Sequence, residues 1–545
     1  MIKNIFFYFG LALILSLTSC QKKVDLIVHN ATVYTMGDNI GKASSFVVDD
    51  GKFVAVGGEE LLNTFNANKI LDLKELPVYP GFIDSHCHFL SLGLSLQKVD
   101  LTGTRSFEEV LGRVKDFAKN KKLKAIVGRG WDQNDWEEKT FPNKTILDEL
   151  FPETPVALRR IDGHALLVNQ KALDLAGIGV NTKIKGGSII KENGKLTGVL
   201  VDAPMKLISN ILPKPSITEK IKALKDAEKI SFENGLTTVS VAGLNKDDIY
   251  LIDSLQKSNA LSIKVYAMIS NSEDNIAHFL SNGPIITEKL TVRSFKIYAD
   301  GALGSRGAAL KSDYSDLKKH RGSFITSKDS LENLAYKLAS TSFQMNTHAI
   351  GDDANKAVLE AYNKALVFSD DPRWRIEHAQ IIDTSDIKLF NRKIIPSVQP
   401  THATSDMYWA EDRLGKKRLQ GAYAYKLLLE KSGRISLGTD FPVENVSPIK
   451  TFFSAVFRED SNLYPEDGYL PNNKLSKLEA LKGMTIWGAY SNFEERQKGS
   501  IEVGKAADFV ILDRDLLDEP KKRILNAKIV ATILDGNIVY SNRIN

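Results

Sequence analysis

The chain has 545 residues, of which 43% are hydrophobic and 26% charged, a composition typical of a folded globular protein rather than a disordered one. This length suggests roughly two or three domains, although a barrel with insertions can absorb much of it. The formal net charge of +5 is small, and the basic residues form only short clusters, as at 121–124 and 415–418, which argues against a nucleic-acid partner.

The first segment has the layout of a secretory signal. A basic residue, an apolar stretch of about a dozen residues and several small residues precede Cys20. The sequence "LTSC" at 17–20 resembles the bacterial lipobox, so we expect a signal peptide over 1–19 and a membrane anchor through lipidated Cys20. Gln21 favours an outer-membrane lipoprotein facing the periplasm. The alternative is an uncleaved anchor with a chance cysteine.

Short strand-like segments follow the signal and recur at the far end of the chain. The segments 24–36, 44–58 and 70–80 include a "DDGK" hairpin turn, and 507–517 and 528–542 have the same character. We expect one small β-sandwich domain built from both chain ends, 20–80 and 491–545, beside a central α/β body.

Between these ends, eight apolar strand-like runs alternate with helical patterns. Eight such units are the count of a (β/α)₈ barrel, so the sequence predicts a TIM-type barrel over 81–490 within an α/β fold. Roughly 150 residues separate the first two runs, more than a crossover needs, which predicts a large insertion at about 102–230. The runs are 80–86, 236–243, 262–268, 293–300, 342–349, 373–379, 394–400 and 434–440.

Polar residues gather at the ends of these runs. In "GFIDSHCHF" (81–89), His86 and His88 are two apart, so on an extended strand their side chains point the same way. Catalytic groups of barrel enzymes lie at the C-terminal ends of the strands, and imidazoles and carboxylates there are able to hold divalent cations. Six residues on five strands should therefore converge on one point: His86, His88, Lys296, His348, His378 and Asp440.

Each of these residues also has a structural interpretation. Lys296 is able to pair with an acid such as Asp300, the later histidines to be satisfied core residues, and Asp440 to cap the helix that follows it. Arg375 and Glu377, which flank a histidine, fit a structural ion pair better than a catalytic one. Only the convergence of the whole set favours a functional site.

Six motifs together resemble the amidohydrolase superfamily, in the branch with YtcJ-like proteins and N-substituted formamide deformylases. The resemblance runs from about residue 24 to the C-terminal end and implies a metal-dependent hydrolase of carbon–nitrogen bonds other than peptide bonds. Relatives often carry a His-Asp pair after strand two, where this chain has Ser240 and Val241, so substrate contacts from that strand are in doubt. The motifs are "PGFIDSHCH" (80–88), "KIYADGALGSR" (296–306), "HAIGD" (348–352), "RIEHAQ" (375–380), "GTDFPV" (438–443) and "KGSIEVGKAADFVILD" (498–513).

The resemblance also implies roles for the converging residues. Lys296 would react with carbon dioxide to form a carbamate that bridges two cations, most naturally zinc, with manganese or iron as alternatives. One ion would be held by His86, His88 and Asp440, and the other by the histidines at 348 and 378. Asp440 would take a proton from the attacking water and deliver it to the leaving amine.

Substrate contacts are expected from three further residues. His164, in "DGHALLVN", lies in the insertion, and relatives place this motif over the mouth of the active site. Trp131, with Trp136, either lines an apolar pocket or packs inside the insertion. His402, just past strand seven, is placed to reach a substrate.

These features favour a hydrolase of a small, partly apolar amide such as an N-acyl or N-formyl amine. A deaminase or a hydrolase of cyclic ureides is an alternative on the same barrel, although "HAIGDDAN" lacks the glutamate that deaminases of the superfamily carry. A non-catalytic lipoprotein that binds a metal or small ligand is a third hypothesis, which Asp440 disfavours because binding alone needs no general base. Oligomerisation is left open.

Overall fold

The computed structural model describes residues 21–37, 41–121 and 123–542. The signal peptide predicted over 1–19 and the lipidation site Cys20 lie outside these ranges. Within them, no helix combines the length and the apolar character that crossing a bilayer requires.

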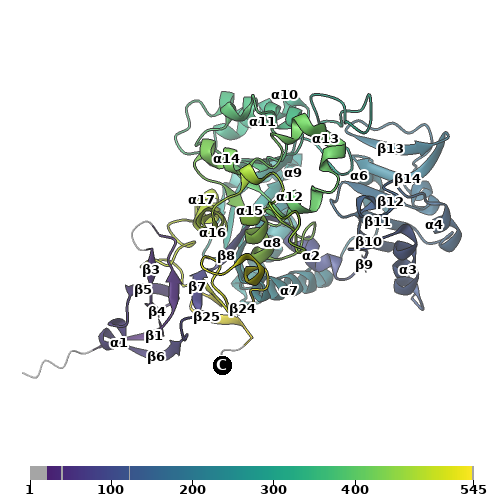
Figure 1. Ribbon diagram of the computed structural model, residues 1–545. Coiled ribbons are helices and arrows are strands. Elements are labelled where there is room, and N and C mark those ends of the chain that lie inside the picture. The colour runs from purple at the N-terminus through teal and green to yellow at the C-terminus, as the bar shows by residue number, and fades with distance from the viewer. Residues whose placement is uncertain (1–20, 38–40, 122, 543–545) are drawn as a thin grey trace, which may run out of the picture.

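A sheet of eight parallel strands forms the centre of the molecule (Figure 1). Its strands follow one another in chain order, which confirms the predicted barrel. Almost every strand residue is buried, as expected for parallel strands covered on both faces. The strands are β8 (Phe82–Cys87), β15 (Leu236–Leu244), β16 (Lys264–Ser270), β18 (Leu290–Tyr298), β19 (Gln344–Ala349), β20 (Trp374–His378), β21 (Ile394–Val398) and β22 (Ser436–Leu437).

The last strand returns to the first and nearly closes the barrel. The backbone N–H of Asp440 donates to the carbonyl of His86 at 2.7 Å, and the N–H of His88 donates to the carbonyl of Phe441 at 2.8 Å. A Cβ at Gly438 would lie 2.5 Å from the backbone nitrogen of His86, so this approach requires glycine. The closure therefore brings "GTD" directly beside "SHCH".

Helices surround the barrel and bury its outer face in one large hydrophobic core. Helix α7 (Ile217–Glu233) begins at a capping box formed by Ser216 and Glu219 and packs against α2 (Phe89–Ser95). The remaining barrel helices are α8 (Lys246–Lys257), α9 (Glu273–Asn282), α10 (Lys328–Ala339), α11 (Asp352–Ala365), α12 (Pro400–Asp406), α13 (Ala410–Leu419), α14 (Tyr425–Ser432), α15 (Pro448–Phe457), α16 (Lys477–Gly483) and α17 (Ile486–Ser491).

The insertion after the first barrel strand is a separate layer with its own six-stranded sheet. It lies to one side of the barrel in Figure 1, opposite the domain formed by the chain ends. The predicted range of about 102–230 included α7, which packs on the barrel instead. The insertion contains β9 (Val99–Asp100), α3 (Phe107–Ala118), β10 (Ile126–Trp131), α4 (Thr145–Leu150), β11 (Val156–Arg160), β12 (Ala165–Val168), α5 (Gln170–Leu175), β13 (Gly187–Glu192), β14 (Lys195–Asp202) and α6 (Met205–Ile211).

The chain ends form a small β domain of two sheets. One sheet contains only N-terminal strands, whereas in the other β7 (Pro77–Pro80) pairs antiparallel with β23 (Phe509–Leu512). Apolar residues of both sheets share one core. The other strands are β1 (Lys22–His29), β4 (Ser45–Asp49), β5 (Lys52–Gly57) and β6 (Phe65–Asp72) in the first sheet, and β2 (Thr32–Tyr34), β3 (Lys42–Ala43), β24 (Ile529–Leu534) and β25 (Asn537–Ser541) in the second.

Candidate metal centre and active site

The barrel brings the predicted histidines and aspartate together at the C-terminal ends of its strands. The ring centroids of His86 and His378 are 4.9 Å apart, and those of His378 and His348 are 4.5 Å apart. Nε2 of His88 lies 3.2 Å from Oδ1 of Asp440. These residues come from β8 and the position directly after it, from β19 and β20, and from the segment after β22, so the barrel geometry assembles the cluster.

Buried polar groups orient two of the imidazoles. Nδ1 of His86 donates to Glu377, and Nδ1 of His378 donates to Oε1 of Gln399 at 2.8 Å. Each donation leaves the Nε2 lone pair for a cation. Burial and the charge of Lys296 lower the pKa of His86 to about 4, so this ring is neutral at pH 7.

Glu377 also forms a fully buried ion pair, with 2.7 Å between its Oε1 and Nε of Arg375. Burial opposes ionisation, but the charge of Arg375 and the hydrogen bond from His86 lower the pKa of Glu377 to about 2. The expected ion pair forms, and Glu377 also contacts His86. The sequence held no signal for that second contact, because 291 residues separate Glu377 from His86.

Asp440 lies at the centre of the cluster, with Oδ2 3.4 Å from Nε2 of His402. Burial would raise the pKa of Asp440, but the hydrogen bond from His88 and the nearby imidazoles hold it well below the usual range. Its backbone has φ of 61°, and that of His378 has φ of 73°, conformations that non-glycine residues adopt at a cost. The fold holds both side chains at these strand ends despite that strain.

Lys296 points at the same cluster. Its Nζ lies 3.1 Å from Nε2 of His86, and burial lowers its pKa to about 8. The pairing with Asp300 that we considered does not form, because Asp300 accepts three backbone N–H groups, among them those of Ile350 and Gly351. Lys296 is thus a buried amine at the centre of a group of potential metal ligands.

The donor set fits divalent cations. Oδ1 of Asp440 is buried, with Nε2 of His88 at 3.2 Å and Nε2 of His86 at 3.8 Å, and such imidazole nitrogens are of the type that binds zinc. In the described part of the chain, two groups have ligand atoms within 4.8 Å of one another: His86, His88 and Asp440, and His378, His402 and Asp440. His402 was expected only as a substrate contact. Its position after strand seven was the one available signal.

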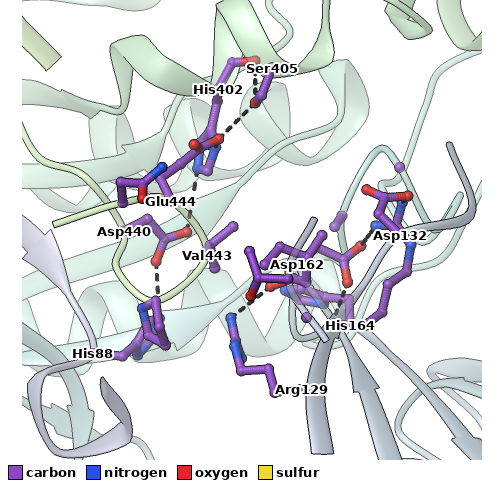
Figure 2. A pocket seen from close by; sticks show the side chains of 18 of the residues that line it. His88, Arg129, Asp132, Asp162, His164, His402, Ser405, Asp440, Val443 and Glu444 are labelled. Carbon is purple, nitrogen blue, oxygen red and sulfur yellow. Dashed lines mark hydrogen bonds and ion pairs between the residues drawn. The ribbon is translucent and has the colours of Figure 1, made fainter. Parts of the chain in front are cut away.

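A cavity of about 660 Å³ opens from this cluster toward the insertion. Figure 2 shows His88, Asp440 and His402 on one side and Asp162 and His164 on the other. His164 was expected near the mouth, and it lines this cavity, with Nδ1 2.6 Å from Oδ1 of Asp202. The insertion therefore forms a polar wall of the cavity.

Trp131 was expected as a possible substrate contact, and this expectation is corrected. Its side chain is 0% exposed and packs in the core of the insertion with Trp136, while its Nε1 donates to the carbonyl of Leu158 at 2.7 Å. On a regular strand Arg129 and Trp131 would share a face, but the strand register shifts between them at Gly130, whose φ is 117°, so Arg129 lines the cavity while Trp131 packs in the core. The sequence pattern did not reveal this irregularity.

Comparison with known proteins agrees with this geometry. A model of the amidohydrolase family matches residues 69–540. The chain is 32% identical to the putative amidohydrolase YtcJ of Bacillus subtilis over 535 residues, 94% of this chain and 99% of that protein. It is 26% identical to the N-substituted formamide deformylase of Arthrobacter pascens over 541 residues, 95% and 98% of the two chains. A crystal structure of a metal-dependent hydrolase from Pyrococcus horikoshii superimposes with a TM-score of 0.73 at 27% identity, covering 91% of this chain and 99% of that one.

Proposed function

The chain belongs to the amidohydrolase family, and we propose that it is a metal-dependent hydrolase that cleaves a non-peptide amide bond of a small, partly apolar substrate such as an N-acyl or N-formyl amine. The observation that carries this proposal is the buried Asp440 carboxylate, which has Nε2 of His88 and Nε2 of His402 within 3.4 Å of its oxygens in the group of potential metal ligands. The full-length similarity to an N-substituted formamide deformylase supports the choice of amide.

We assign His86, His88 and Asp440 to one cation and His348 and His378 to the second. A bound divalent cation would supply Lewis-acid activation of water and of the scissile carbonyl. Asp440 is ionised at neutral pH, so it is able to accept a proton from the attacking water and return it to the leaving amine. Glu377 keeps the imidazole of His86 in one tautomer and orientation during this cycle.

Lys296 completes the proposed site as a carbamate. A pKa of about 8 leaves a fraction of the amine neutral near pH 7, and the neutral amine adds to carbon dioxide with loss of one proton to give an anionic ligand. We expect Lys296→Arg, which cannot form this group, to lose most of the second equivalent of metal. Two tightly held ions per chain in that variant would contradict the carbamate.

The function is tested by metal analysis of the full-length protein followed by hydrolysis of a panel of N-formyl and N-acyl amines. We expect bound zinc, manganese or iron and release of the amine from at least one member of the panel. Removal of metal with a chelator should abolish that release, and its return should restore it. A metal-loaded protein that cleaves none of the amides would contradict the proposal.

We also propose that the protein is a lipoprotein of the cell envelope, anchored through Cys20 and facing the periplasm from the outer membrane. The support is the "LTSC" motif after an apolar segment. Cys20→Ser should remain an unlipidated precursor. Persistent labelling of that variant with a palmitate analogue would contradict the anchor.

A further inference from the structure

Two cationic side chains on the insertion side of the cavity have no acidic partner. Lys98 and Arg129 both line the cavity. Nη2 of Arg129 donates to the carbonyl of Ile161 at 2.6 Å, but its Nε is buried without any partner. The ammonium group of Lys98 forms neither a hydrogen bond nor an ion pair with the described residues.

A third cation on the same wall, in contrast, is paired with acidic side chains. Arg160 is 1% exposed and is paired with both Asp132 and Asp162, the latter at 2.7 Å. The other oxygen of Asp162 accepts the backbone N–H of His164 at 2.9 Å, and Oδ1 of Asp132 also accepts that of Asn134 at 2.8 Å. Among the described residues, Arg129 therefore has no carboxylate within ion-pair distance, and the charges of Asp440 and Asp162 act on it only from farther away.

The electrostatics of the wall agree with this. Burial, followed by repulsion from Arg159, lowers the pKa of Arg129 to about 10, so its guanidinium remains charged at neutral pH. Burial and the two arginines also lower the pKa of Lys98. Partly buried charges of one sign are costly unless a counter-charge arrives. In the view of Figure 2, Arg129 lies between His88 and His164.

We infer that Arg129 and Lys98 bind a carboxylate of the substrate, so that the hydrolysed amide is an N-acylated amino acid or a similar amide acid. This inference rests on the proposed function and deepens it. The free N–H groups of a guanidinium match the two oxygens of a carboxylate, and an ammonium supplies a further donor. A monoanion also suits this wall better than a dianion, because Asp132 and Asp162 are close by.

The test compares two ligands that differ only in charge, N-acetyl-leucine and N-acetyl-leucine amide. Their affinities are measured by calorimetry on the metal-loaded, full-length Asp440→Asn protein, in which slow turnover does not disturb the titration. We expect the acid to bind at least about 10-fold more tightly than the amide, and Arg129→Gln to reduce that preference by about 10- to 100-fold. Lys98→Gln should reduce it less, and Arg129→Lys should retain part of it.

Lys124→Gln is the matched control, an exposed lysine of the insertion, and should leave the preference unchanged. Unchanged thermal unfolding and metal content show that each variant is folded. Equal binding of acid and amide would overturn the inference, and so would a preference that survives Arg129→Gln, since the carboxylate would then sit on the metal. Failure of the wild type to hydrolyse any amide, with the preference for the acid intact, would instead reject the proposed function alone.

Discussion

The two walls of the cavity are built in different ways. On the barrel wall, His86 and His378 come from separate strand ends, and each is held by one buried partner on its Nδ1. On the insertion wall, Arg160 binds two acids at once and Arg129 binds none. The barrel wall thus presents lone pairs and a carboxylate, whereas the insertion wall presents two cations, Lys98 and Arg129, that have no acidic partner within ion-pair distance among the residues that the structure describes.

On this view, the barrel wall would carry out the reaction and the insertion wall would select the substrate. Groups on the barrel wall would hold cations and transfer protons, which any substrate of the enzyme needs. Groups on the insertion wall would bind the part of the substrate that lies beyond the reacting bond. Variants of the two walls should therefore fail in different ways, and the following predictions run from the largest expected effect to the smallest.

Asp440→Asn tests the barrel wall most directly. An amide oxygen still binds a cation but cannot transfer a proton, so turnover should fall by roughly 10²- to 10⁴-fold while much of the metal remains. Rates and metal content are measured on one preparation, with Asp467→Asn, at an exposed acid that does not line the cavity, as the control. A metal-replete variant with a near wild-type rate would remove Asp440 from the proton transfer.

Trp131→Ala tests whether the insertion needs its own core to present its wall. Removal of this fully buried side chain should lower the free energy of unfolding by about 3–5 kcal/mol. Chemical denaturation measures the change, and Phe368→Ala, at a side chain that is 97% exposed, is the control. A stable Trp131→Ala protein with altered substrate preference would return Trp131 to the list of substrate contacts.

Glu377→Gln weakens a support of the barrel wall without removing a proposed ligand. The neutral amide orients His86 less well and leaves Arg375 without its charge partner, so metal affinity should fall by about 10- to 100-fold. Competition with a chelator measures this, and Glu466→Gln, at an exposed acid, is the control. Wild-type affinity in Glu377→Gln would mean that the ion pair is structural only.

Asp202→Asn should have the smallest effect, confined to the insertion wall. Burial lowers the pKa of His164, but the hydrogen bond and charge of Asp202 raise it above its ordinary value overall. A raised folded-state pKa adds stability that is complete below about pH 6.5 and is lost as the pH rises through the folded value. The variant should thus lose about 1 kcal/mol at pH 5 and less at pH 8. Chemical denaturation of the metal-free wild type and variant at pH 5 and pH 8 measures this loss in the free energy of unfolding. A difference between the two proteins that does not depend on pH would contradict the pairing.

The same contrast explains what the sequence could predict. The eight strands were found because buried parallel strands are continuous apolar runs, and the ends of those runs located His86, His348, His378 and Asp440. In the insertion, the sequence offered no comparable pattern for locating the residues that line the cavity. That Arg129 meets the cavity and Trp131 does not depends on the irregularity of the strand between them, and the pairing of Arg160 with Asp132 joins residues that are 28 positions apart in the sequence.

The roles of supporting residues were likewise hidden by distance along the chain. Glu377 was read beside its sequence neighbour Arg375, and its contact with His86 follows only from barrel closure. His402 was placed near the site by its strand, yet its approach to Asp440 depends on where the segment after β22 returns. Sequence patterns therefore located strand ends better than the partners that meet there.

The pairing of β7 with β23 has a consequence for biosynthesis. Strand β7 is made early, but its partner, and the acids Asp508 and Asp535 that bind Lys264 at 2.7 and 2.6 Å, arrive only near the end of translation. At roughly 5–20 residues per second, this edge waits unpaired for a time on the order of tens of seconds. An unpaired apolar strand edge invites aggregation, so the nascent chain needs a chaperone or rapid export during that interval.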